Sequence, residues 1–413
     1  MANVEIDGVN SKVYTDQVDP KTGTTLTLGT SGDTVSIPSG VTITNSGTDG
    51  GGFGINATNF RPNARPLIIN GDMTVAQRST SVAGLTGLGY QTVDRYSGAA
   101  ASLGTWTQSQ DTSVPTGEGF SKSLKMDCTT ANASPSAGGY VYLDYAIEAQ
   151  DLQLLKYGSS SAETITVAFW VKAYQTGVMQ LTLYDWDNDK IISASYEIDS
   201  SATWEKKILT FAGNTSANFT VDNAKGLSLW FPLDTGSNYE SGALRSSWTA
   251  YSAGDFNPAG AVNVGDNTNN YWQITGLQLE VGEYTSSTIP PFQHESYGNN
   301  LARCQRYFQN LLRGAIDVSM CMGRYYNSTS VGGVFHLPVS MRAAPTVTSN
   351  TGTNYYNSSG NATNDYFDSL TRNDSGLQTI GWYSSDAVSG TQGFASLIMT
   401  GSSSASVFFV SEL

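Results

Sequence analysis

Histidine and cysteine are scarce in this sequence, which contains two histidines and three cysteines among its 413 residues. Cys128, Cys304 and Cys321 are too widely spaced to form a disulfide framework or a zinc pattern, so we expect three reduced, buried thiols. Neither His294 nor His336 has a serine or cysteine nucleophile at a recognisable spacing. The sequence also lacks a G-x-S-x-G elbow and a credible phosphate-binding loop. These absences predict a protein that is not an enzyme.

Basic residues are also less frequent than acidic ones. The sequence has 21 Lys and Arg against 35 Asp and Glu, which gives a net charge of −14. Because binding to a phosphate backbone requires clustered cations, we expect no nucleic-acid partner. No run approaches the roughly 18 apolar residues of a membrane span, so we expect no membrane insertion. The N-terminus has no basic region followed by an apolar stretch, which predicts synthesis in a cytoplasm without a signal peptide.

Aromatic and turn-forming residues are abundant instead. Aromatic side chains make up 11% of the sequence, with 22 Tyr and 8 Trp, and there are 43 glycines. The polar remainder consists largely of Ser, Thr and Asn, residues that suit strands and tight turns more than helices. The composition therefore predicts a mostly β fold and excludes a coiled coil.

Residues 1–64 contain short apolar pairs that alternate with polar residues, as in TTLTLG and DTVSIP, and turn signals separate them. The segment has few large side chains, so it cannot bury enough apolar surface to fold alone. We therefore predict an N-terminal segment that forms oligomers or attaches the chain to a partner protein. A flexible tail is the alternative.

Residues 65–298 show one alternating stretch after another, which predicts a β-sandwich. In TITVAFWVKA, for example, every second residue from Ile165 to Val171 is apolar. The alternation in YWQITGLQLEVG changes phase at Gly276, which predicts a β-bulge. The segment 148–158 instead predicts a short surface helix that ends at Gly158.

Several of these stretches resemble a known class of protein. LIINGDMTVAQRS at 67–79 and YWQITGLQLEVGEYTSSTIPPFQHESYG at 271–298 are similar to the jelly-roll domains, like carbohydrate-binding modules, of bacteriophage tail-fibre and virion proteins of the marine phage type. LARCQRYFQ at 301–309 resembles the same family. The resemblance covers about residues 65–350. It implies a virion component with a jelly-roll sandwich and, by analogy, a homotrimer.

Residues 299–413 predict a linking helix followed by a C-terminal β-domain. Apolar residues with helical spacing predict a helix over 295–312, with Asn299 or Asn300 as its cap. Strands resume after it. The polar stretch 349–374 predicts a functional loop, since its aromatic residues could stack on sugar rings beside many amides; they are Tyr355, Tyr356, Tyr366 and Phe367. The alternative is that these rings belong to a local core.

One segment of the sandwich predicts a cation site. Asp185, Asp187 and Asp189 lie within five residues and resemble the first half of a calcium loop. The pattern fails at Lys190 and Tyr196, where a calcium loop has glycine and glutamate, and a simple hairpin turn is the alternative. Trp186 lies at the tip of this turn and is a further candidate for sugar binding. No other cofactor is expected.

The sequence and the resemblance together predict a non-enzymatic phage tail-fibre or receptor-binding component, made in the host cytoplasm and located in the virion. Its expected partners are two further copies of the chain, a phage tail or capsid protein that contacts residues 1–64, and a glycan of the host surface. Two alternatives remain at this point. One is a capsid or tail decoration protein that binds no sugar, and the other is a polysaccharide depolymerase.

Overall fold

The structure is a computed structural model that describes residues 65–258, 260–360 and 363–413. The N-terminal segment predicted over 1–64 lies outside the described residues. Nearly all of the regular secondary structure in the described part consists of antiparallel strands, which confirms the mostly β fold.

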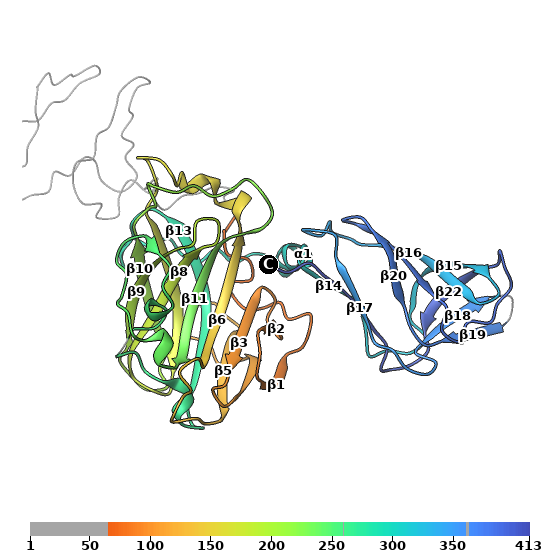
Figure 1. Cartoon of the computed structure of the whole chain (residues 1–413), viewed down its shortest axis with the longest axis horizontal. Coiled ribbons are helices and arrows are strands. Elements are labelled where there is room, and N and C mark those ends of the chain that lie inside the picture. Colours follow the sequence, from red (N-terminus) through yellow and green to blue (C-terminus); the bar gives the residue numbers. More distant parts are fainter. Residues whose placement is uncertain (1–64, 259, 361–362) are drawn as a thin grey trace, which may run out of the picture. The chain divides into compact units, whose positions relative to one another are not determined.

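The first half of the described chain is a sandwich of two sheets (Figure 1). In spatial order, the six-stranded sheet contains β1 (Ser81–Leu85), β4 (Thr105–Asp111), β5 (Ser123–Thr130), β13 (Tyr271–Val281), β7 (Ile165–Ala173) and β10 (Glu205–Phe211). The seven-stranded sheet contains β12 (Thr249–Ala250), β9 (Lys190–Ile198), β8 (Gly177–Asp185), β11 (Lys225–Thr235), β6 (Tyr140–Glu148), β3 (Tyr96–Ala101) and β2 (Gly89–Tyr90). Successive strands from β5 to β8 belong to alternate sheets, so the core contains residues that are distant in sequence.

Alternation along the strands places the large apolar side chains between the two sheets. Phe169 of β7 and Phe231 of β11 meet edge to face with ring centroids 5.3 Å apart, and Trp272 of β13 lies 5.5 Å from Phe231. All three side chains are fully buried. The buried aromatic residues therefore explain how a chain so rich in Gly, Ser and Thr supports a large core.

The predicted bulge at Gly276 is confirmed. The register between β13 and β7 shifts between Thr275 and Gln278, and Gly276 has a φ of +62°. A Cβ atom at this position would lie 2.6 Å from the ring of Phe120. Glycine is needed here because the backbone is left-handed and a neighbouring ring leaves no space for a side chain.

Short 3₁₀ helices connect the strands of the sandwich. The helix predicted near 148–158 is the 3₁₀ helix η1 (Ala149–Leu155), which buries Leu152 and Leu155 and ends at Lys156, whose φ is +54°. Three further turns follow β11, namely η2 (Ser237–Tyr239), η3 (Ala253–Asp255) and η4 (Val264–Asp266). They belong, with β12, to a long segment between β11 and β13, in which β12 pairs with the edge strand β9.

The helix that follows the sandwich is shorter than predicted. Helix α1 spans Tyr297–Gln305, and its N-cap is Ser296, whose hydroxyl accepts a hydrogen bond from the Asn299 backbone N–H. The predictions of a helix to residue 312 and of an asparagine cap are therefore wrong. Residues Phe308–Arg313 form strand β14 instead, because they pair with a strand from the end of the chain.

The second half of the described chain has its own two sheets. The three-stranded sheet contains β14, β23 (Ser406–Val410) and β17 (Thr346–Ser349). The seven-stranded sheet contains β19 (Thr363–Phe367), β18 (Tyr356–Gly360), β22 (Ala395–Thr400), β15 (Ser319–Asn327), β16 (Ser330–His336), β21 (Thr379–Ser384) and β20 (Thr371–Ser375). Their core, around Phe335, Trp382 and Phe409, is separate from that of the first sandwich.

All three cysteines are free; Cys128 and Cys304 are buried, and Cys321 is half-buried. Among the residues that the structure describes, no helix is long and apolar enough to cross a membrane.

Candidate functional site

Aromatic residues gather on the outer face of the first sandwich's seven-stranded sheet, whose spatial order runs from β12 to β2. On β6, Val141 and Leu143 point into the core, so Tyr140 and Tyr142 alternate with them onto the outer face. On β11, the core residues Leu229 and Phe231 flank Trp230, which therefore also lies on the outer face. Strand pairing places Trp230 opposite Asp144 of β6 and opposite Thr182 of β8. Tyr184 of β8 lies two residues beyond Thr182 on the same face, so three neighbouring strands contribute rings to one surface.

These rings form a continuous series, which we call the aromatic tract. Tyr184 stacks on Trp230 with centroids 4.5 Å apart and an interplanar angle of 16°. Trp186 stands edge-on to both, with its centroid 4.8 Å from Tyr184 and 6.1 Å from Trp230. In the other direction the series runs from Trp230 to Tyr142 at 6.1 Å, then to Tyr140 at 5.6 Å and to Tyr239 at 5.7 Å.

Trp186 is the most accessible ring of the tract. Its side chain is 42% exposed, whereas Trp230 is 7% exposed. The indole N–H of Trp186 donates a hydrogen bond to Ser228 Oγ at 2.9 Å, and Lys225 Nζ lies 4.9 Å from the ring centroid. The ring is therefore held in place before any ligand arrives, which lowers the entropic cost of binding.

Two polar atoms beside the tract have no hydrogen-bond partner, Asp144 Oδ1 and Trp230 Nε1. The other carboxylate oxygen of Asp144 lies 3.4 Å from Lys225 Nζ. Burial raises the pKa of Asp144, and Lys225 opposes this effect. Because buried polar atoms in folded proteins are normally paired, one acceptor and one donor beside the tract remain unsatisfied.

The covering segment between β11 and β13 limits the tract on one side. Phe256 packs on Trp230 and Tyr142, with centroid distances of 5.4 and 5.2 Å, and is buried. Gln180 Nε2 on β8 donates a hydrogen bond to the Phe256 carbonyl at 3.0 Å. One part of the outer face is thus closed by the chain itself, while Trp186 remains exposed beyond it.

This arrangement suits a molecule that has flat apolar faces and hydroxyl groups. An exposed ring can stack on the C–H face of a pyranose, and unpaired donors and acceptors can bind its hydroxyls. Sequence analysis identified Trp186 but missed Trp230, Tyr184 and Tyr142. The available signal was the segment GYVYLDY, in which tyrosines occupy the face that alternation otherwise leaves polar.

The structure places two of the four aromatic residues predicted for sugar binding at 349–374, Tyr356 and Phe367, in a core. This stretch contains strands β18 and β19, which pair through Tyr356 and Phe367. Both rings are fully buried and stack with centroids 5.6 Å apart, so they belong to the core and cannot contact a ligand. Tyr355 is half-buried against the same core, and Tyr366 is 40% exposed. The alternative of a local core describes Tyr356 and Phe367 correctly.

The three aspartates of the predicted calcium site accept hydrogen bonds from neighbouring groups of the chain. Asp185 is buried, and its Oδ1 accepts hydrogen bonds from the backbone N–H groups of Asp187 and Asn188, both at 3.1 Å. Asp187 accepts from Thr220 N, and Asp189 accepts from the Tyr184 hydroxyl. The three carboxylates thus close a hairpin turn and hold its neighbours. Within the described ranges, no group of three His, Cys, Asp or Glu residues could hold a metal ion.

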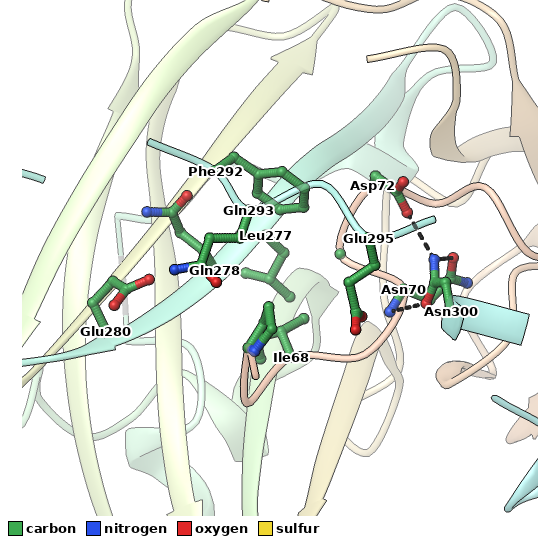
Figure 2. Close-up of a pocket in the computed structure, with 12 residues that line it drawn as sticks. Ile68, Asn70, Asp72, Leu277, Gln278, Glu280, Phe292, Gln293, Glu295 and Asn300 are labelled. Carbon is green, nitrogen blue, oxygen red and sulfur yellow. Dashed lines mark hydrogen bonds between the residues drawn. The ribbon is translucent and has the colours of Figure 1, made fainter. Parts of the chain in front are cut away.

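A small pocket between the sandwich and helix α1 also contains polar groups (Figure 2). Asn300 of α1 donates hydrogen bonds to Asp72 Oδ1 at 3.1 Å and to Asn70 Oδ1 at 3.3 Å, and accepts one from the Asn70 backbone at 3.0 Å. Glu295, which also lines the pocket, pairs with Arg303 at 2.5 Å. Because these groups form hydrogen bonds and an ion pair with one another, they attach helix α1 to residues 70–72.

Comparisons with known proteins find similar solved structures, of which three at 9–12% identity are described next. The tailspike protein 4 enzymatically active domain of bacteriophage CBA120 is 12% identical over 52% of this chain and 21% of that chain, with a TM-score of 0.28. The module TmCBM61 in complex with β-1,4-galactotriose is 12% identical over 53% of this chain and 99% of its own, with a TM-score of 0.25. The family 11 carbohydrate-binding module from Clostridium thermocellum, in complex with a β-1,3-1,4-mixed-linked tetrasaccharide, is 9% identical over 52% and 99%, with a TM-score of 0.24.

No protein-family model matches the sequence, and no curated protein matches it. Structural likeness at these TM-scores assigns no family. The candidate site therefore rests on its own geometry.

Proposed function

We propose that the outer face of the seven-stranded sheet β12–β2 binds a glycan and that the ligand stacks on Trp186. The observation that carries this proposal is an exposed indole fixed by Ser228 and Lys225 at the end of the aromatic tract. The unpaired atoms Asp144 Oδ1 and Trp230 Nε1 supply an acceptor and a donor for sugar hydroxyls.

The charges beside the tract favour a neutral sugar. Lys225 and Asp144 form an ion pair with each other, so their charges cancel on this face. Asp144 is 4% exposed, and its unpaired oxygen can accept a hydrogen bond from a sugar hydroxyl. We therefore propose a neutral oligosaccharide as the ligand of this face and propose that it is bound without hydrolysis.

Replacement of Trp186 by alanine is expected to lower the affinity for this oligosaccharide about tenfold. A tenfold loss corresponds to about 1.4 kcal/mol, in the range expected for one aromatic contact together with its buried area. A glycan array with the full chain would first identify the sugar, and calorimetric titration would then compare the variants. Mass spectrometry of the sugar after titration would show whether it stays intact.

Tyr174→Ala is the matched control, because Tyr174 is 45% exposed but lies at the end of β7 in the opposite sheet, against Tyr271. We expect this variant to bind like the parent chain. Equal affinity of the Trp186→Ala variant and the parent, or an equal loss in the Tyr174→Ala variant, would contradict the proposal.

We further propose that the chain is a homotrimeric receptor-binding component of a phage virion, attached through residues 1–64. The sequence motifs near residues 67–79 and 271–298 support this role. Light scattering of the full chain is expected to give three times the chain mass of 44.0 kDa. A monomer at micromolar concentration would contradict the trimer. If the chain bound no glycan on the array, a role as a decoration protein would be favoured instead.

A further inference from the structure

A second cleft is separate from the aromatic tract. It has a volume of about 780 Å³, within the range of pockets that hold small ligands. One wall comes from the segment around β1 and β2, including Arg78 and Tyr90, and the other comes from β14, β17 and β23, including Arg313 and Phe408. Many of its remaining lining residues are serines.

The charge of this cleft is opposite to that of the whole chain. Its lining contains two arginines and no Asp or Glu, although the chain carries a net charge of −14. Arg78 and the buried Arg95 share the carboxylate of Glu412, with distances of 2.9 and 3.0 Å, so one carboxylate faces two guanidinium groups. The exposed Arg313 adds another positive charge across the cleft. The cleft thus favours an anion.

Two polar atoms in the lining have no partner. Arg78 Nη1 and Ser406 Oγ are both buried without a hydrogen bond, and Ser406 is 4% exposed. Strand pairing places Ser406 opposite Arg313. A guanidinium donor and a hydroxyl donor therefore lie in the same cleft as the exposed Arg313, and all three can donate hydrogen bonds to oxygen atoms of one ligand.

The rest of the lining suits a sugar. The rings of Tyr90 and Phe408 are half-buried, and Ser81, Ser404 and Asn350 are exposed beside them. The guanidinium of Arg78 is held in place because it lies 3.6 Å above the ring of Phe308. Fixed guanidinium groups bind carboxylate and sulfate through paired hydrogen bonds, while half-buried rings and short polar side chains bind the sugar itself.

We propose that this cleft is a second binding site and that it takes an acidic saccharide, whose negative group is the carboxylate of a uronic acid or a sulfate ester. Arg313 and Arg78 bind the negative group, and Ser406 donates to one of its oxygen atoms. Tyr90 and Phe408 contact the sugar ring. The cleft is positively charged, whereas the charges beside the aromatic tract cancel, and the two sites share no residue.

The test is calorimetric titration of the full chain with trigalacturonate, with its fully methyl-esterified and therefore neutral form, and with a sulfated galacto-oligosaccharide. We expect at least one of the two acidic probes to bind at least tenfold more tightly than the neutral ester. The two acidic probes distinguish a carboxylate from a sulfate as the negative group.

Arg313→Gln is expected to reduce the affinity for the acidic probe about tenfold, because it removes one charged hydrogen-bonding group. Ser406→Ala removes only the unpaired hydroxyl and should lower affinity by a smaller factor while leaving the Tm unchanged. Arg324→Gln is the control, since Arg324 is exposed on β15 over Tyr326 and does not line the cleft. It should bind like the parent chain.

Three outcomes would overturn this proposal. They are binding of both acidic probes no tighter than that of the neutral ester, no binding of either acidic probe, and unchanged affinity for the tighter acidic probe in the Arg313→Gln variant. Trp186→Ala tests whether the two sites are independent, because this variant should leave the affinity for the acidic probes unchanged. A failure at one site is therefore distinguishable from a failure at the other.

Discussion

Replacing Arg306 by alanine is expected to lower the free energy of unfolding by about 3–5 kcal/mol at pH 7, since it leaves a buried carboxylate without its cation. That carboxylate is Glu148 at the end of β6, whose side chain is fully buried. Arg306 binds it through two hydrogen bonds of 2.7 Å, and the Tyr307 hydroxyl donates a third at 2.6 Å. These contacts join the sandwich to the end of helix α1.

The effect of this substitution should depend on pH. Burial by itself raises the pKa of Glu148, but hydrogen bonds from Arg306 and Tyr307 outweigh it and hold the pKa below its ordinary value. A carboxyl group with a lowered pKa stabilises the folded state above its ordinary pKa of 4.5, and this stabilisation is lost as the pH falls through the folded-state pKa. The cost of Arg306→Ala should therefore be largest near neutral pH and should shrink in acid.

Urea denaturation of the full chain at pH 7 and pH 4 would measure both effects. Lys156→Gln is a suitable control, because Lys156 and Glu163 form an exposed ion pair whose loss should cost less than about 1 kcal/mol. A cost below 1 kcal/mol for Arg306→Ala at pH 7 would show that Glu148 finds other partners.

Replacing Asp234 by asparagine is expected to stabilise the chain by about 2–4 kcal/mol at pH 8 and by much less at pH 5. Asp234 lies on β11 and is fully buried. Its Oδ2 accepts a hydrogen bond from the Gly265 backbone at 3.0 Å, whereas its Oδ1 has no partner. Asparagine keeps the acceptor and removes a buried negative charge.

Asp234→Asn is expected to stabilise the chain because burial raises the pKa of this carboxyl from 3.8 to about 7. The folded state therefore binds a proton more tightly than the unfolded state, and between pH 4 and pH 7 the stability falls as the pH rises. This difference between the folded and unfolded pKa values lowers the free energy of unfolding by at most about 4 kcal/mol above pH 7. Below pH 5 the carboxyl is neutral in the folded chain, so asparagine should then offer little advantage.

Thermal unfolding at the two pH values would test this expectation. Asp317→Asn, the same change at an exposed position, should leave the Tm unchanged at both. A variant Asp234→Asn that is less stable than the parent at pH 8 would show that the charge is compensated within the fold.

The sequence predicts the fold of the sandwich well because period-two alternation reports directly on which side chains face the core. It failed after residue 305 for a physical reason. Phe308 and Leu312 fit the spacing of a helix and also that of a strand, and only pairing with β23, almost a hundred residues later, favours the strand. No local pattern contains that information.

The site was harder to predict than the fold. Tyr356 and Phe367 appear in a polar stretch, yet strand pairing places them in a core, so composition misplaced them. Tyr142 and Trp230 lie in strands with apolar residues on both faces, and such strands do not reveal which face is outside. The three aspartates at 185–189 resembled a metal site because acidic turns and calcium loops share residues.

Binding of a sugar to the outer face around Trp186 is the central proposal for this protein. The most direct measurement is a crystal structure of the full chain with the neutral oligosaccharide that binds best on an array. We expect a pyranose ring stacked on the Trp186 indole and a sugar hydroxyl hydrogen-bonded to Asp144 Oδ1. A sugar bound elsewhere in the crystal, with the Trp186 face empty, would contradict the account.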